Sequence, residues 1–189
     1  MKSPFYLEEI SSVTNSYELK SFRIQYNEEQ LLKYLVKFAR KHTEQSLNKI
    51  YLVRNSKTKT IVAWFGLKSA TLPFNDKGNS FLIPAIEMTH FAVDERFKSP
   101  ENEKRPIKTG EFIFWNYILP IVQNVSEAVG CKNLFLFAIN TPKLINYYKT
   151  KLGFKEFLNL DDKDFFDYAI SDYDSDCKFL YMPITNEKD

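Results

Sequence analysis

The sequence predicts one α/β domain with a mixed, mostly antiparallel sheet, in which a central pair of parallel strands is flanked by helices. An apolar run at 85–93 has the composition of a strand. After Gly110, apolar residues recur every four positions and predict a long amphipathic helix: Ile113, Tyr117, Ile121, Val125 and Val129. A second apolar run at 134–139 follows, so this helix is expected to be the crossover between two parallel strands.

The segments before this unit predict an antiparallel arrangement. Residues 18–26 alternate loosely and predict a first strand, after which Asn27 is placed to cap a helix. Ranges 50–53 and 60–67 predict a hairpin with a polar turn at 54–59. Residues 73–80 are rich in turn formers and predict a loop.

The segments after 134–139 complete the predicted domain. Pro142 suits the first position of a short helix that ends at Gly153. Ranges 154–158 and 178–183 predict closing strands. Inside the long helix, Pro120 is expected to introduce a kink or a division.

Length and composition favour a single domain over residues 1–189, with a core at about 20–184. The 44% hydrophobic content is ample for a core, and Trp64 and Trp115 are expected to lie in it. No apolar run reaches the roughly 20 residues that cross a bilayer, so no membrane association is expected. Cys131 and Cys177 lack metal-ligand spacing and predict reduced thiols in a cytoplasmic protein.

The net charge of +2 conceals an uneven distribution. Residues 155–189 carry a net charge of −6, which leaves +8 for residues 1–154. The acidic segment has two interpretations, a solvated loop or an attractor for a cationic amine substrate. The basic remainder favours a polyanion such as coenzyme A or RNA, although an excess of this size does not establish nucleic-acid binding.

The segment 105–110, Arg-Pro-Ile-Lys-Thr-Gly, lies between a strand and the long helix, where backbone N–H groups can hold a phosphate. Three motifs in this order resemble the GCN5-related N-acetyltransferase (GNAT) family: Glu87 to Val93, Arg105 to Gly110, and Leu144 to Phe154. The segment 105–110 resembles the family's pyrophosphate loop, with Lys108 in place of its first glycine.

This resemblance implies an acyltransferase, an acetyl-coenzyme A-dependent N-acetyltransferase without a metal, in which the amine attacks the thioester directly. Acetyl-coenzyme A is the implied cosubstrate. The residues expected to bind it are Phe91, Val93, Arg105, Ile107, Lys108, Thr109, Gly110, Asn140 and Tyr148. Lys108 keeps a backbone N–H, provided that its φ is ordinary.

The same resemblance implies the catalytic residues. Tyr148 matches the phenol that protonates the departing thiolate, and Tyr147 is the alternative because one extra residue precedes Gly153. Glu87 is the candidate base for the incoming amine, and His90 is its rival. In a regular strand these two side chains point to opposite faces, so both reach one slot only if the strand bulges.

The acceptor is not identified by the sequence. A small amine, a peptide terminus, a lysine and aminoacyl-tRNA are all compatible with the motifs, the last as in the toxin branch of the fold. A noncatalytic coenzyme A-binding regulatory protein is the alternative from another functional class. The resemblance is also compatible with a homodimer.

Overall fold

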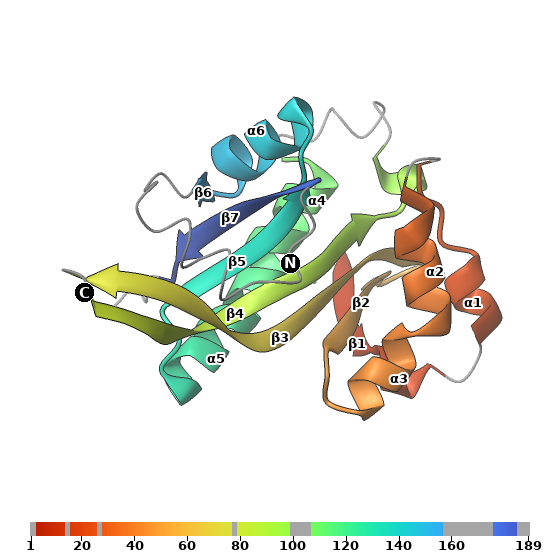
Figure 1. Ribbon diagram of the computed structural model, residues 1–189. Helices are drawn as coiled ribbons and strands as arrows, with labels where there is room; N and C mark the ends of the chain where they lie inside the picture. The colour runs from red at the N-terminus through yellow and green to blue at the C-terminus, as the bar shows by residue number, and fades with distance from the viewer. Residues whose placement is uncertain are drawn as a thin grey trace. The chain divides into compact units, whose positions relative to one another are not determined.

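A computed structural model of the chain describes residues 3–13, 16–25, 28–76, 79–98, 107–156 and 176–184. Seven strands form one sheet in the order β1-β2-β3-β4-β5-β7-β6 (Figure 1). The chain divides into two compact units, and strands β3 (Ile61–Asp76) and β4 (Asn79–Val93) contribute to both. The first unit is Met1–Lys68 with Met88–Ile118, and the second is Ser69–Glu87 with Leu119–Asp189.

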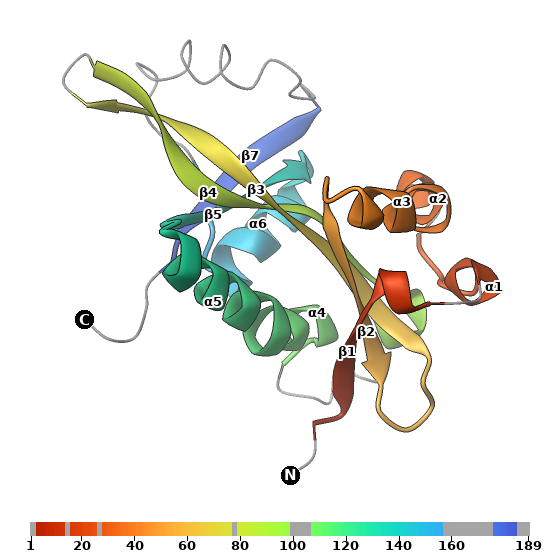
Figure 2. The same ribbon diagram turned by 90° about the horizontal axis from the view of Figure 1, so that it is seen from below.

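The first unit contains two further strands and a group of short helices. Strand β1 (Phe5–Glu9) pairs antiparallel with β2 (Lys49–Asn55), and β2 pairs antiparallel with β3. Figure 2 shows β1 and β2 side by side. The helical segments are η1 (Ile10–Ser12), α1 (Ser16–Lys20), α2 (Glu29–Lys37), α3 (Ala39–Glu44), η3 (Glu95–Phe97), α4 (Thr109–Ile113) and the π-helical η5 (Phe114–Ile118).

The core of the first unit lies between the helices α1 to α3 and one face of the strands. Its members are Ile10, Val13, Leu19, Phe22, Leu35, Ala39, Ile50, Leu52, Ile61, Trp64 and Ala92. Trp64 is fully buried, which confirms the prediction for this residue. Burial of such large apolar side chains contributes about 2 kcal/mol each, so this cluster holds the helices on the strands.

Arg54 ties three elements of this unit together. Its guanidinium is almost fully buried and donates to Glu8 of β1, to both carboxylate oxygens of Glu18 of α1 at 2.6 and 2.9 Å, and to the carbonyl of Lys59 at 2.8 Å. A buried guanidinium needs all of these acceptors, because an unpaired charge in the interior is costly.

The predicted strand at 18–26 is wrong, because the segment begins with α1. Leu19 and Phe22 are both buried in the cluster, and their spacing of three residues follows a helical period. The first strand is β1, which the sequence analysis missed. Its pairing partner β2 lies more than forty residues away in the sequence, so the pairing itself is not visible in a local pattern. Helix α2 confirms the helix predicted to follow Asn27, a residue that lies outside the described ones.

The predicted loop at 73–80 is also wrong. Strand β3 continues to Asp76 and β4 starts again at Asn79, so the turn formers lie within a long hairpin. Turn-forming composition locates the reversal of the chain but does not say how far strand pairing extends toward it. At the earlier hairpin, Arg54 and Asn55 belong to β2 and shorten the predicted turn at 54–59.

The long helix predicted after Gly110 is present as α4, η5 and α5 (Leu119–Val129) in succession. The π-helical turn lies directly before Pro120, which has no N–H for the regular ladder, and the side-chain amide of Asn116 donates to the carbonyl of Phe112 at 2.8 Å. The predicted division is therefore confirmed. Trp115 belongs to this turn and is 42% exposed, so its expected core position is wrong.

The second unit contains the predicted parallel pair. Strand β5 (Asn133–Ile139) runs parallel to β4 at Ile86↔Leu134 and Glu87↔Phe135, and antiparallel to β7 (Cys177–Pro183). The short β6 (Lys155–Glu156) pairs with the other edge of β7. A cluster of Leu72, Ala85, Phe135 and Phe179 packs in this unit.

Helix α6 (Pro142–Lys151) follows β5, with Pro142 at its first position as predicted. Gly153 adopts a positive φ of 79°, and the N–H of Phe154 donates to the carbonyl of Tyr148 at 3.1 Å. Glycine tolerates this left-handed conformation, which closes the helix as the sequence predicted. Cys131 and Cys177 are both free thiols.

Candidate acetyl-transfer site

The predicted pyrophosphate loop meets the long helix at Lys108, which precedes the first residue of α4. Lys108 has φ −66° and ψ 150°, an ordinary extended conformation, so the lysine fits here without the freedom of a glycine. Its side chain does not cap the helix. The first N–H groups of a helix lack partners within the helix, so this end is suited to an anion.

The other residues of the predicted loop differ in how deeply they are buried. Thr109 is buried and donates its hydroxyl to the carbonyl of Phe97 at 3.0 Å, which fastens α4 to the segment after β4. Gly110 is buried, whereas Ile107 is 44% exposed. Arg105 lies outside the described residues.

The end of β4 is held by Asp94, which is fully buried. Its carboxylate accepts from the backbone N–H groups of Arg23 and Arg96, at 2.9 and 3.0 Å, and from the Arg96 guanidinium at 2.6 and 2.8 Å. Burial alone raises the pKa of Asp94, but these hydrogen bonds outweigh it and lower the pKa below its ordinary value. The charged carboxylate of Asp94 therefore holds the backbone at the end of β4, before the segment that leads to α4.

Strand β4 carries four of the predicted residues. Phe91 and Val93 lie in the first unit, where Phe91 is half-buried and Val93 is buried. Glu87 is half-buried in the second unit, beside β5. His90 lies in the first unit and stacks on Tyr34 of α2 with ring centroids 4.0 Å apart.

Thr89 and His90 are consecutive residues of β4, and both lie close to β3. A Cβ on Gly66 of β3 would lie 2.5 Å from the Thr89 hydroxyl, and Trp64, two residues along β3, has its ring centroid 5.2 Å from that of His90. Gly66 and Trp64 share one face of β3. The bulge that would let Glu87 and His90 share a slot stays a prediction.

A hydrogen-bonded network surrounds His90. The side-chain amide of Asn48 donates to the hydroxyls of Tyr34 at 3.1 Å and Thr89 at 2.7 Å. Thr89 contacts Nδ1 of His90 at 2.9 Å, and Tyr34 contacts Nδ1 of His42 at 3.0 Å. Burial, reinforced by the neighbouring His42 and Lys68, lowers the pKa of His90 to about 4, so its ring is neutral at pH 7.

The predicted acid lies on the inner face of α6. Ile145, Tyr148 and Leu152 are all buried and follow a helical stripe, and the ring of Tyr148 meets that of Phe154 edge-on at 5.6 Å. Tyr147 is half-buried and points about 100° away around the helix. The buried position therefore belongs to the tyrosine that the sequence analysis preferred.

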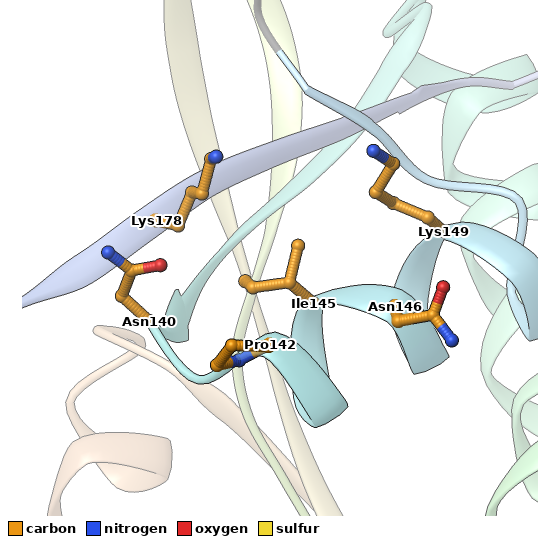
Figure 3. A pocket seen from close by; sticks show the side chains of 6 residues that line it. All are labelled: Asn140, Pro142, Ile145, Asn146, Lys149 and Lys178. Atoms are coloured by element: carbon orange, nitrogen blue, oxygen red, sulfur yellow. The ribbon is translucent and has the colours of Figure 1, made fainter.

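A cavity of about 510 Å³ lies beside α6 in the second unit. Figure 3 shows Asn140 and Pro142 at one end, near Lys178, and Asn146 and Lys149 at the other, with Ile145 between them. Lys149 and Lys178 both pair with Glu156, at 2.8 and 2.5 Å. Two ammonium groups that share one carboxylate leave the cavity lining with a positive excess.

The structure places Glu87, Asn140 and Tyr148 in one unit, and Phe91, Val93 and residues 107–110 in the other. The sequence analysis missed Tyr34, Asn48 and Thr89, and also the cavity lysines. Asn48 precedes a strand and resembles an ordinary turn residue, so only its contacts reveal its place in a network. Within the described ranges, no group of three or more potential metal ligands comes together, and no helix is long and apolar enough to cross a membrane.

Solved structures resemble this chain over nearly its whole length. An AtaT toxin mutant bound to the C-terminus of the antitoxin AtaR and acetyl-CoA matches with a TM-score of 0.65 and 16% identity, covering 96% of this chain and 94% of that one. A tyrosine-to-phenylalanine mutant of KacT matches with a TM-score of 0.67 and 17% identity, covering 96% of each chain. The chain has the GNAT fold.

A further match extends this comparison. AtaT complexed with acetyl-methionyl-tRNAfMet has a TM-score of 0.67 and 16% identity, and the alignment covers 95% of this chain and 94% of that one. No family model matches the sequence, and no curated protein matches it either. The GNAT fold therefore rests on the arrangement of the elements, which confirms the fold that the three motifs implied.

Proposed function

We propose that this chain is an acetyl-coenzyme A-dependent N-acetyltransferase of the toxin type, with the amino group of an aminoacyl-tRNA as its acceptor. The observation that carries the proposal is the two-way match, above 90% of each chain, to AtaT bound to acetyl-CoA and to AtaT complexed with acetyl-methionyl-tRNAfMet.

Acetyl-coenzyme A supplies an acetyl group that is already activated as a thioester. The neutral amine attacks the carbonyl carbon, a C–N bond forms, the C–S bond breaks, and the thiolate leaves. In our proposal Glu87 takes the proton that the amine loses, and the Tyr148 hydroxyl protonates the thiolate.

The chain's own groups fit the cosubstrate at the helix start. We assign the diphosphate to the backbone amides of residues 107–110, with charge from Lys108 and Arg105. The ordinary φ of Lys108 and its uncapped position before α4 support this assignment. We assign the pantetheine arm to the backbone of Phe91 and Val93 and to Asn140.

Binding is the first test. Acetyl-coenzyme A at a hundred times its Kd stabilises a folded protein by about 2.7 kcal/mol, so a clear rise in melting temperature is expected. Replacing Gly110 with a bulkier residue should weaken this effect, because the amides there need close access to the diphosphate. Absence of any stabilisation or of any calorimetric heat at saturating cosubstrate would contradict the whole proposal.

Transfer is the second test. Radiolabelled acetyl-coenzyme A is incubated with a panel of charged tRNAs, free amino acids and peptides, and label is followed on the acceptor. We expect label on aminoacyl-tRNA, and Tyr148→Phe should lower kcat by about 100-fold or more while cosubstrate binding persists. Tyr147→Phe is the matched control and should retain activity. Binding without transfer to any acceptor would favour the noncatalytic regulatory protein instead.

A further inference from the structure

Asn48 organises two hydroxyls and, through them, the chain's only two histidines. Its amide has two N–H donors, and both are used, one on Tyr34 and one on Thr89. Each hydroxyl accepts from Asn48, so its own proton is available to the Nδ1 atom of the histidine within hydrogen-bond distance. Since all of these residues belong to the first unit, the network is a local construction.

The direction of these hydrogen bonds decides the tautomer of His90. A Thr89 hydroxyl that donates to Nδ1 requires that Nδ1 carry no proton, so the proton of the neutral ring lies on Nε2. The opposite direction would leave the Thr89 proton without an acceptor among the described residues. Among the described residues the only hydrogen bond of the His90 ring is the one at Nδ1, so an N–H at Nε2 is available to a ligand.

Within the part of the chain that the structure describes, the residues around Asn48 leave two buried polar atoms without partners and leave space for the network at Gly66. Asn48 is 6% exposed, and its Oδ1 atom is buried without a partner among the described residues, as is Nε1 of Trp64. Each buried polar atom without a partner lowers the free energy of unfolding by about 1–3 kcal/mol. Packing alone does not explain why the chain keeps polar side chains at these positions. Gly66 leaves the space for the network, because a Cβ there would lie 2.5 Å from the Thr89 hydroxyl and 3.0 Å from the Asn48 amide.

We propose that Asn48 is a positioning residue that, through the Thr89 hydroxyl, fixes His90 as the Nε2–H tautomer, and that His90 donates a hydrogen bond to an oxygen atom of the bound substrate. His90 is then a neutral donor and not the base. The tautomer follows from the network alone, whereas the contact with substrate rests on the proposed function. A carbonyl or developing oxyanion is the chemistry that a neutral N–H donor recognises.

Nitrogen NMR of protein labelled in its two histidines tests the network without any substrate, with His42→Gln used for assignment. We expect His90 at pH 7 as a single neutral tautomer protonated at Nε2. Thr89→Val, which removes the hydroxyl at constant shape, should give a mixture of tautomers, and Thr89→Ser should restore the single form. Observation of the Nδ1–H tautomer in the unaltered protein would overturn the proposal.

Kinetics with charged tRNA test the role of His90. His90→Ala should lower kcat/KM by about 100-fold, the usual effect of removing one donor to a developing oxyanion. His90→Gln keeps an N–H near the Nε2 position and cannot act as a base, so it should retain activity within about tenfold of the unaltered protein. Equal loss in both variants, with melting temperatures unchanged, would refute the donor role.

The NMR and kinetic experiments together distinguish failure of the His90 proposal from failure of the proposed acetyltransferase function. If the unaltered protein transfers no acetyl group to any acceptor, the proposed function and the donor role both fail, and the NMR result still decides the tautomer. If transfer occurs but Thr89→Val leaves kcat unchanged, Asn48 and Thr89 have no part in positioning His90 for the reaction.

Discussion

Some buried polar side chains that join separate segments of this protein have hydrogen-bond partners for all of their polar atoms. Asp94 is the clearest case, because four hydrogen bonds from Arg23 and Arg96 compensate a carboxylate with no exposed surface. Asn48 differs, since its amide nitrogen is fully used while its oxygen is not. The first pattern is typical of structural residues and the second of residues retained for a function.

Asp94→Asn tests the first pattern. We expect a loss of about 3 kcal/mol at pH 7, because Arg96 would lose its charged partner inside the protein. The pKa of Asp94 is lowered in the folded state, so its stabilisation is present above the unfolded value of about 3.9 and is lost as the pH falls through the lower, folded pKa.

Urea denaturation at pH 7 and at pH 3 measures both effects. The unaltered protein should lose more stability than Asp94→Asn between these two pH values. Asp176→Asn provides a matched control, since this residue is exposed in the structure. An equal acid sensitivity of the Asp94 variant and the unaltered protein would show that the carboxylate does not carry the effect.

At the scale of elements, strand pairing and helix packing depend on a few buried connections. Arg54 of β2 acts as a clamp that joins β1 through Glu8 and α1 through Glu18, although these partners lie 46 and 36 residues away in the sequence. The π-helical turn before Pro120 is a comparable adjustment, because it absorbs a residue that a regular helix would exclude. The Arg54 contacts join partners distant in sequence, whereas the π-helical turn is a local adjustment.

Arg54→Ala tests the clamp. We expect it to destabilise the protein by about 3–5 kcal/mol, since Glu8 and Glu18 would keep their charges without their partner. Glu9→Gln is the matched control, and because the ion pair of Glu9 with Lys49 is exposed on both sides its loss should cost less than about 1 kcal/mol. Chemical denaturation measures both values, and similar losses in the two variants would argue against a buried clamp.

At the scale of the whole molecule, the uneven charge and the GNAT fold bear on the acceptor. Residues 1–154 carry a net charge of +8, while residues 155–189 carry −6. Most of the acidic segment lies outside the described residues, so its role as an attractor for a cationic amine stays a prediction. A polyanionic tRNA is expected to contact the basic remainder of the chain.

Salt dependence tests this expectation. We expect the affinity for aminoacyl-tRNA to fall by roughly one power of the salt concentration for each phosphate that a lysine or arginine neutralises. Fluorescence titration between low and physiological salt measures the slope, and the melting temperature over the same range is the control. Binding that does not respond to salt would place the recognition on uncharged groups.

Much of the fold could be predicted from the sequence because its signals are local. The helical spacing after Gly110, the apolar run of β5 and the end of α6 at Gly153 all act within a few residues. Tyr148, which the motifs favoured over Tyr147, is the more deeply buried of the two. The catalytic and cosubstrate-binding roles of the predicted residues stay predictions.

The sequence by itself determined the parallel pair, its helical crossover and the order of the motifs, since periodicity and turn chemistry depend on neighbouring residues. The tertiary structure alone decided that β1 is a strand, how far the β3–β4 hairpin extends, and that Trp115 is exposed. It alone assembled Tyr34, Asn48, Thr89 and His90, because these residues come from three separate segments and meet only when the first unit packs.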